Sequence, residues 1–591
     1  MTFVKAQLEN VFGADLRSLA AMRIACALLI IVDLLQRSTD LVAHYSDFGV
    51  VPRTTVIEHS SSRWFVSFHL MSGTWEVQAM LFLLGAVCAF GLLAGYRTRL
   101  FSILSWAFFI SLCARNPFIL QGGDVLFRVV LFWGMFLPWG ACYSVDSAWN
   151  PSSDKLPKSC LSWGAAAYAI QIVFVYWFTV TLKSGAQWWS EGSAVYYAMS
   201  IDYLVTPLGR LLLDLPAPVL KLTTWGVLLF EIVGPLALLW PVKTGVIRTI
   251  AVFCFWGLHL AFLLTLLIGT FPIVNMIAMI FFLPPSFWDS IMEGLKSPER
   301  TGLKIYYDQD CGFCSRSVRL IRTFFLLPEA EVTGAQTVAA IEADMKLHNS
   351  WVVIDAAGAK QFRYDAAISI AGASPVLWPL APILKLSAVR WVGERIYAYV
   401  SNHRATSCRL IIETPTAPDL KLRSSFVANL AIVSLITYVF VWNLANIPEL
   451  GFRIPERVRS VGNILGLDQV WNMFAPFPAK DDGWYVIPGT LKSGSVVDLF
   501  RDGKEISLQK PAFISLTYKN HRWRKYIELM RKRDFLQPVF AHYLCRDWNR
   551  RHRGGEALQD LEIIFFLEWT QPHYQYSPVE KMSVFKHRCA S

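Results

Sequence analysis

The sequence predicts a polytopic α-helical membrane protein of about nine spans, with an inserted α/β domain and a C-terminal extramembrane α+β domain. Hydrophobic residues make up 54% of the 591 residues, and apolar stretches of helix length recur along the chain. One polar stretch holds a strand, a Cys-x-x-Cys motif and a helix pattern, and the polar C-terminal stretch begins with alternating, strand-like segments and continues with basic, helical ones. A chain this long and apolar exceeds one soluble domain, so a membrane protein with added polar domains accounts for it.

We expect nine segments to cross the membrane, whose hydrocarbon core is about 30 Å thick. They are Leu16–Leu35, Val77–Ala94, Leu100–Ala114, Asp124–Trp139, Leu161–Leu182, Thr223–Trp240, two spans within Thr249–Trp288, and Ser425–Leu444. Thr249–Trp288 holds 40 residues without an acid, lysine or arginine, and Gly269, Thr270 and Pro272 predict the turn between its two spans. In the fourth span, Asp124 and Arg128 lie four residues apart and are expected to neutralise each other.

Charge in the short loops predicts the orientation. The net charge of +11 needs no nucleic-acid partner, because loop residues and lipid headgroups account for it. The basic residues after the second, fourth and sixth spans fall on one side, and they are Arg97, Arg99, Lys155, Lys158, Lys243 and Arg248. That side is expected to be cytoplasmic, which places the N-terminus and the inserted domain inside and the C-terminal domain outside. The eleven cysteines are scattered and show no disulfide framework.

Lys183 follows the uncharged run Leu161–Leu182, at the point where the fifth span leaves the lipid. Trp188 and Trp189 come next, as interfacial aromatics should. One interpretation is a lysine that snorkels to the interface beside a tryptophan belt. The other is a lysine held at a water-poor pocket, where burial disfavours its charged form and allows it to act as a base.

The run YWFTVTLKSGAQWWSEG around Lys183 resembles the segment of vitamin K-dependent gamma-carboxylases that carries their catalytic lysine. The region up to about Trp288, including GGDVLFRVVLFWGMFLPWG at Gly122–Gly140, resembles the related HTTM family of membrane domains. This resemblance implies a helical pocket that binds a quinone or quinol, with Lys183 as the base that deprotonates the quinol. Ser184 stands where the carboxylases usually have a second lysine.

Two further polar residues lie inside predicted spans. Glu231 is an intramembrane carboxylate, which is costly unless it is protonated or paired. His259 lies in the seventh span, where a lone histidine is either a satisfied structural group or part of a site. Glu231, His259 and Lys183 could together line a polar pocket between helices. The resemblance to the carboxylases implies roles for His259 and for Asn275.

The motif KIYYDQDCGFCSRSVRLIRTFF, Lys304–Phe325, places Cys311 and Cys314 between a short strand and a helix. This layout is typical of a thioredoxin-like redox site. The helix N-terminus stabilises the thiolate of Cys311, and Cys314 is placed to resolve a mixed disulfide. The alternative is half of a zinc site, but the chain has no second Cys-x-x-Cys, so no metal is predicted.

The same stretch resembles the DCC family of thiol–disulfide oxidoreductases, whose Asp-x-x-Cys-x-x-Cys motif is matched by Asp308, Cys311 and Cys314. The segments SWVVIDAAGAKQFRYDAAI and ERIYAYVSNHRATSC, the latter ending at Cys408, match the family's later strand and closing helix. The resemblance implies a redox-active Cys311–Cys314 disulfide and a cellular thiol as its reductant.

We therefore expect four parts: a carboxylase-like membrane domain at 1–292, a thioredoxin-like domain at 300–413, a further membrane helix at 424–446 and an extramembrane domain at 447–591. The leading hypothesis is a redox enzyme of the bacterial cytoplasmic membrane, acting on a peptide or a lipid-like substrate. The alternative is a non-catalytic transporter or maturation scaffold for an exported peptide. Neither hypothesis involves nucleic acid.

Overall fold

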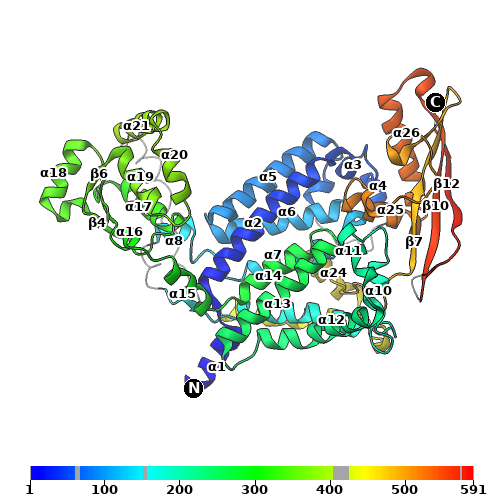
Figure 1. Ribbon diagram of the computed structural model, residues 1–591, viewed down its shortest axis with the longest axis horizontal. Helices are drawn as coiled ribbons and strands as arrows, with labels where there is room; N and C mark the ends of the chain where they lie inside the picture. The colour runs from blue at the N-terminus through cyan, green and yellow to red at the C-terminus, as the bar shows by residue number, and fades with distance from the viewer. Residues whose placement is uncertain (1, 60–66, 151–155, 404–424, 573–574, 590–591) are drawn as a thin grey trace.

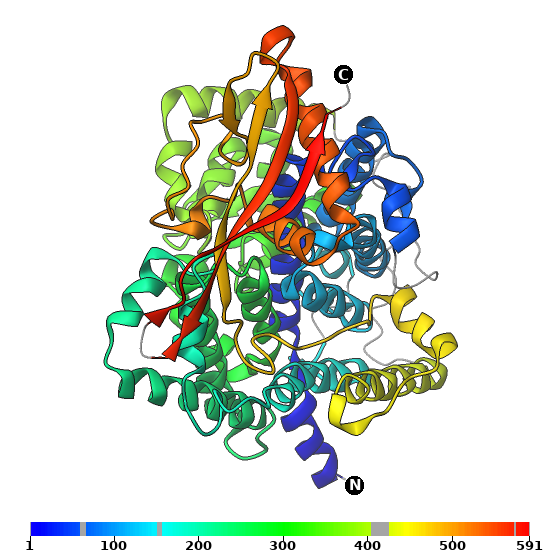
Figure 2. The same ribbon diagram turned by 90° about the vertical axis from the view of Figure 1, so that its right-hand side faces the viewer.

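The computed structural model describes residues 2–59, 67–150, 156–403, 425–572 and 575–589. A bundle of long helices forms the middle of the molecule, with an α/β module at one end and a β-sheet at the other (Figure 1). The sheet lies across its end of the bundle, with the chain's C-terminal strands on the outside (Figure 2). Lys155 and Cys408 lie outside the described residues.

Seven described helices are long and apolar enough to span a membrane. They are α2 (Leu16–Ser38), α5 (Trp75–Ala94), α6 (Thr98–Arg115), α9 (Trp163–Leu182), α12 (Ala217–Leu238), α13 (Thr244–Thr265) and α23 (Phe426–Leu444). An eighth span is formed if Phe271–Phe282, which contains α14 (Phe271–Met279), is joined to α15 (Pro285–Gly294) across a 90° bend. The turn before it is at Gly269, whose φ of +70° favours glycine. The polytopic membrane fold is confirmed, with seven or eight spans where about nine were predicted.

Helix α7 (Gly122–Gly134) accounts for most of the difference in span number. It was expected to run to Trp139 and cross the membrane, but its 13 residues reach only about 20 Å. The helix stops before Pro138, which cannot continue it. All but two of its residues are buried, and it packs against α6, α9 and α14. Helix α7 is therefore the centre of the bundle and not a lipid-facing span.

The remaining helices are short and connect the spans. They are α1 (Thr2–Phe12), α3 (Leu41–Tyr45), α4 (Arg53–His59), α8 (Val145–Trp149), α10 (Ala194–Met199), α11 (Pro207–Leu211) and α16 (Pro298–Thr301). Strands β1 (Ala14–Asp15) and β2 (Ser159–Cys160) form a small antiparallel pair that joins the chain before α2 to the chain before α9.

The module has a four-stranded sheet in the order β4–β3–β5–β6. The strands are β3 (Lys304–Tyr307), β4 (Glu331–Gly334), β5 (Val352–Ile354) and β6 (Lys360–Phe362). Strands β3 and β4 are parallel, and the other two pairs are antiparallel. The module's helices are α17 (Gly312–Phe324), α18 (Ala339–His348), α19 (Arg363–Ala373), α20 (Ala381–Leu384) and α21 (Ser387–Asn402). The predicted α/β fold with the Cys-x-x-Cys motif between a strand and a helix is confirmed.

The C-terminal part is built around one long strand. Strand β10 (Leu558–Gln571) pairs with four others: β7 (Asp481–Val486), β8 (Pro488–Leu491), β11 (Gln575–Tyr576) and β12 (Glu580–Arg588). Strand β9 (Val496–Asp498) pairs with β8 and gives the hairpin that the alternating sequence predicted. Helices α24 (Glu456–Leu465), α25 (His521–Lys532) and α26 (Leu536–Arg551) complete this part, and the last two are the predicted basic helices.

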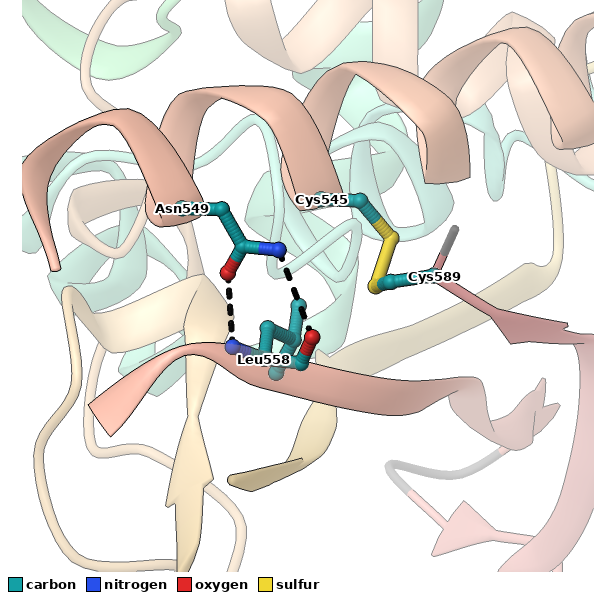
Figure 3. The surroundings of a disulfide bond; sticks show 4 residues. All are labelled: Cys545, Asn549, Leu558 and Cys589. Carbon is teal, nitrogen blue, oxygen red and sulfur yellow. Dashed lines mark hydrogen bonds between the residues drawn. A yellow bond between two sulfur atoms is a disulfide. The ribbon is translucent and has the colours of Figure 1, made fainter. Parts of the chain in front are cut away.

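A disulfide ties α26 to the end of the sheet. Cys545 on α26 is bonded to Cys589, which follows β12 (Figure 3). One turn further along α26, Asn549 bonds both the N–H and the carbonyl of Leu558. The sequence had suggested no disulfide framework, and 44 residues separate the two cysteines with no spacing pattern to pair them.

Four buried charges join the C-terminal part to the bundle. Arg522 on α25 donates to Asp33 Oδ1 at 2.7 Å and to Asp124 Oδ1 at 3.1 Å. Arg37 donates to Asp33 Oδ2 at 2.6 Å and to Asp124 Oδ1 at 2.5 Å. The predicted neutralisation of Asp124 by Arg128 is therefore wrong, because Asp124 caps its own helix at the Gln121 N–H and faces the two arginines. Arg128 instead pairs with Asp468 at 3.1 Å.

Replacing Arg522 by methionine tests this network. Two aspartates would then share the single buried Arg37, and a broken buried ion pair typically costs about 3–5 kcal/mol. We expect Arg522→Met to lower the thermal unfolding midpoint and to make residues 480–589 exchange amide hydrogens faster. Lys532→Met is the control on the same helix, because Lys532 is half exposed and its pair with Glu528 is a surface pair. Unchanged exchange in Arg522→Met would show that apolar contacts alone hold the C-terminal part.

Candidate functional site

Lys183 is buried at the end of α9. The helix stops at Leu182, and Lys183 has a non-helical backbone, which turns its side chain back into the protein. Its ammonium donates to the Glu231 carboxylate on α12, and only 3% of the lysine side chain is exposed. The ammonium also lies 4.0 Å from the centre of the Trp188 ring, a cation–π contact. Lys183 therefore does not snorkel to the surface of the described structure, whereas half-exposed Trp189 fits an interfacial position.

A segment from the C-terminal part covers this lysine. Residues 471–477, which we call the cover segment, lead from α24 towards β7. Trp188 Nε1 donates to Phe474 O at 2.9 Å, and the Gly185 N–H donates to Pro476 O at 3.0 Å. The Phe474 side chain packs into one apolar cluster with Trp188. The only signal for this segment in the sequence is the aromatic run WNMFAPFP in an otherwise polar region, which did not predict a contact with Lys183 or Trp188.

Glu231 lies at an irregular point of α12. Pro235 is inside the helix and has no N–H to donate to the carbonyl of Glu231, four residues earlier. The carboxylate is buried and bonded to Lys183. A buried carboxylate and ammonium in direct contact are each stabilised by the other, and removing either leaves an unpaired buried charge.

His259 belongs to a second polar group on neighbouring helices. Its Nε2 lies 2.7 Å from the Tyr176 hydroxyl of α9, and that hydroxyl donates to Asn275 Oδ1 at 3.2 Å. The Asn275 amide nitrogen donates to Phe271 O, so its oxygen is the atom facing Tyr176. Because the single phenol proton goes to Asn275, His259 Nε2–H is the donor to Tyr176, and Nδ1 carries the free lone pair. Nδ1 is buried and has no hydrogen-bond partner among the described residues.

Aromatic rings connect the two groups. The ring centres of Tyr176 and Phe255 of α13 are 4.7 Å apart, and those of Phe255 and Phe230 of α12 are 4.6 Å apart. Phe230 directly precedes Glu231 in α12. The structure therefore brings Lys183 and Glu231 into contact, whereas His259 belongs to a separate hydrogen-bonded group with Tyr176, which the sequence did not reveal. A polar pocket lined by Lys183, Glu231 and His259 together stays a prediction.

An apolar groove runs along the outer side of the same helices. It has a volume of about 450 Å³ and lies between α12 and α13. It is lined by Gly226, Leu229, Phe230, Val233, Gly234, Ala237, Ile247, Ile250, Ala251 and Cys254. The glycines leave room for it, since a side chain at Gly226 would meet no atom within 4 Å. A groove of this composition suits a hydrocarbon chain.

The dithiol lies at the other end of the bundle. Cys311 is the residue before α17 and is partly exposed, and Cys314 is buried within the first turn. Asp308 shapes the loop between β3 and α17, since its Oδ1 accepts from Gln336 Nε2 at 2.7 Å and from the Asp310 N–H at 3.2 Å. This places Cys311 at the positive end of the helix dipole, as predicted from the sequence.

A pocket of about 280 Å³ adjoins Cys314. It lies between α17, α19 and α21, and its walls are mostly apolar. Phe313, Ile321, Phe325, Trp351, Ile370 and Val400 line it together with Cys314, and Arg363 and Tyr397 are its larger polar residues. An apolar group could therefore approach the second cysteine of the motif.

Helix α17 also contacts the bundle directly. It packs against α8, where the Arg316 guanidinium lies 5.4 Å from the centre of the Trp149 ring. Trp149 in turn contacts Tyr96, which follows α5. The dithiol helix therefore rests on α8 at the end of the bundle next to the α/β module (Figure 1).

Three buried carboxylates in the C-terminal part are close enough to hold a cation: Asp202, Asp482 and Glu568. The Lys510 ammonium is a cation that already binds two of them, since it lies 2.6 Å from Asp202 and is bonded to Glu568. Burial, followed by the neighbouring Asp202, raises the pKa of Asp482 well above its usual range. Lys510, together with Arg210 at 3.8 Å from Asp202, supplies this cluster with positive charge from within the chain.

Fold and site together define an integral membrane protein that carries a dithiol module. Residues 13–288 match the HTTM domain, and residues 305–410 match the DCC1-like thiol-disulfide oxidoreductase. The chain is thus a fusion of an HTTM membrane domain and a DCC1-like thiol–disulfide oxidoreductase domain, as the sequence resemblance indicated. No curated protein and no solved structure matches the chain significantly.

The Lys183–Glu231 pair can be tested apart from any activity. Glu231→Gln keeps the side-chain shape but leaves a buried ammonium without a counter-charge, so we expect a loss of about 3–5 kcal/mol in unfolding free energy. The double variant Lys183→Met/Glu231→Leu removes both charges and should regain most of that loss. Thermal unfolding in detergent measures both effects. Lys221→Met, exposed on the same helix, is the control and should unfold like the wild type. A fully stable Glu231→Gln variant would contradict the pair.

Proposed function

We propose that the protein is a membrane redox enzyme in which the HTTM domain holds a proton-transfer site and the DCC1-like domain exchanges electrons with thiols. The observation that carries the first half is the set of buried titratable groups on three adjoining spans: Lys183 bonded to Glu231, and His259 bonded to Tyr176. Buried ionisable groups inside a membrane are costly, and such groups typically mark a functional pathway or site.

Lys183 is the proposed base. A lysine can accept a proton only after it has given up its own, and the Glu231 carboxylate in contact with it is the natural acceptor. After this transfer the proton lies on Glu231, and both side chains are neutral. The Lys183 amine can then take a second proton, from a substrate hydroxyl. His259 Nδ1 offers a free lone pair nearby and could accept a hydrogen bond from the same substrate.

A quinol or a lipid-like molecule fits these surroundings. Aromatic rings of Tyr176, Phe230 and Phe255 surround the polar groups, and an apolar groove runs along α12 and α13. A quinol supplies the acidic hydroxyl that a base requires, and it would bring a hydrocarbon tail to the groove. The groups present therefore suit a quinol, with the head towards Lys183 and His259.

The DCC1-like domain supplies the thiol chemistry. The Cys311 thiolate attacks a substrate disulfide and forms a mixed disulfide, and Cys314 then attacks Cys311 and releases the substrate. The substrate receives two electrons and two protons, and the domain is left with a Cys311–Cys314 disulfide. A cellular thiol returns it to the dithiol form. Asp308 orders the loop that presents Cys311 and is a positioning residue.

We further propose that the dithiol faces the cytoplasm and the C-terminal part the outside, in a bacterial cytoplasmic membrane. The basic residues Arg97, Lys158 and Lys243 support this orientation by the positive-inside tendency. The Cys545–Cys589 disulfide supports it as well, because disulfides persist on the oxidising side of a membrane.

Lys183→Arg separates a base from a structural cation. Arginine keeps the charge that pairs with Glu231 but does not release its proton, so we expect activity to fall by about 10² or more while the protein still folds. Quinol-dependent oxygen uptake, at matched protein levels and unfolding temperatures, is the measurement. Purified wild type should also carry extractable quinone. Equal activity in the arginine variant would reject the base, and would favour the transporter or scaffold alternative.

Cysteine variants test the thiol chemistry. Cys311→Ser should abolish reversible oxidation of the domain, because the attacking thiolate is lost. Cys314→Ser should instead accumulate mixed disulfides on Cys311, because the resolving thiol is lost. Gel-shift alkylation after a mild oxidant distinguishes the two states. Cys254→Ser, an exposed thiol on α13, is the matched control and should behave like the wild type. Identical behaviour of all three variants would leave the dithiol without a redox role.

A further inference from the structure

The DCC1-like domain carries an apolar face that no other part of the described chain covers. It is formed by the turn at Trp378–Leu380 and by α20 and α21, and none of these three elements contains a buried residue. We call it the outer face. Its exposed large side chains are Val376, Trp378, Leu380, Ile383, Leu386, Trp391, Val392, Ile396 and Tyr399. So many large apolar side chains in 24 residues indicate an interaction surface.

The outer face is distinct from the side of α21 that packs on the domain. On the inner side, Gly393 lies against the Tyr364 ring, so closely that a side chain there would overlap it. Arg390 forms an ion pair with Asp365 of α19 on the same side. Val392, Ile396 and Tyr399 follow each other at helical spacing and are exposed. Helix α21 is therefore apolar on the side that does not pack against the rest of the domain.

Charge and residue type favour a lipid surface. Between residues 374 and 403 the basic side chains besides Arg390, which is paired with Asp365, are Lys385 and Arg395, and the single acid is Glu394. The Arg395 guanidinium lies 3.7 Å from the centre of the Trp391 ring. Tryptophan beside arginine is typical of segments that lie in the headgroup region, and basic residues add attraction to anionic lipids.

The position of the domain brings lipid within reach. The chain enters the domain after α15, which belongs to the bent membrane segment, and it leaves towards the span α23 that begins at Phe426. Helix α17 is already seated on α8 of the bundle. Helix α20 lies on the edge of the domain that faces the bundle, whereas α18 lies on the far edge (Figure 1).

From these observations we infer that the outer face rests on the bilayer surface, with Trp378 and Trp391 among anionic lipid headgroups. This contact and the contact of α17 with α8 would hold the domain in one orientation. The dithiol would then stay next to the membrane, and α21 would have lipid on one side and the Cys314 pocket on the other. The inference does not depend on the chemistry proposed above.

Lipid photocrosslinking tests it on the full chain. The protein is placed in nanodiscs of phosphatidylcholine and phosphatidylglycerol with a phosphatidylcholine that carries a diazirine near its glycerol, and labelled peptides are mapped by mass spectrometry. We expect residues 376–400 to be labelled at least about tenfold more than α18, whose Leu347 is 77% exposed on the far edge. Labelling should fall when phosphatidylglycerol is left out. The lipid-facing side of α12 serves as the internal standard.

A charged variant and its control complete the test. Ile383→Asp/Ile396→Asp should reduce the labelling of 376–400 to the level of α18, with α12 labelling and reversible dithiol oxidation unchanged. Leu347→Asp should leave the labelling of 376–400 as in the wild type. Labelled α12 with an unlabelled 376–400 would overturn the inference. Crosslinks from 376–400 to a second copy or to a soluble protein, in place of lipid, would overturn it equally.

Discussion

The four buried charges of Arg37, Arg522, Asp33 and Asp124 are the contact on which the rest of the structure depends. They come from α2, α7 and α25, and their charges balance inside the protein. Ion pairs this deep give little net stability but define one arrangement, because any other leaves a buried charge unpaired. With α25 held in this way, the C-terminal part can place its cover segment over Lys183. The site of the membrane domain is therefore completed by a part of the chain almost 300 residues further on.

Features set by residues close together in the sequence could be predicted from it. The segments Val77–Ala94 and Leu161–Leu182 are uncharged runs of helix length, and the spans α5 and α9 lie close to them. The dithiol site was equally accessible, because strand, motif and helix follow each other directly from Lys304 to Phe324. The contact between Lys183 and Glu231 follows from their placement on spans, since polar residues within a membrane turn towards each other, whereas His259 bonds Tyr176.

Contacts between distant segments could not be predicted. Asp124 and Arg128 are four residues apart on one helix, yet each pairs with a partner from another part of the chain, because helix α7 is surrounded by protein. The same burial explains why α7 was mistaken for a span: apolar on all sides, it reads like a lipid-facing helix but ends after 13 residues. Nothing in the sequence distinguishes Tyr176 from the other aromatic residues of its span, so its hydrogen bonds could not be predicted. Its role follows only from the positions of His259 and Asn275.

The two candidate redox centres lie too far apart to exchange electrons by contact. Lys158, five residues before α9, pairs with Asp289 of α15, the helix that precedes the module. Helix α9 ends at Lys183, and its 20 residues cover about 30 Å. A thiolate and a disulfide must touch to react, so a shared reaction requires a carrier that moves between the two ends. In the arrangement proposed above, the bilayer is the continuous medium between the two ends, through the groove of α12 and α13 and through the outer face beside the Cys314 pocket. A membrane-soluble carrier satisfies this geometry, whereas a water-soluble one would have to cross the bilayer between the two sites.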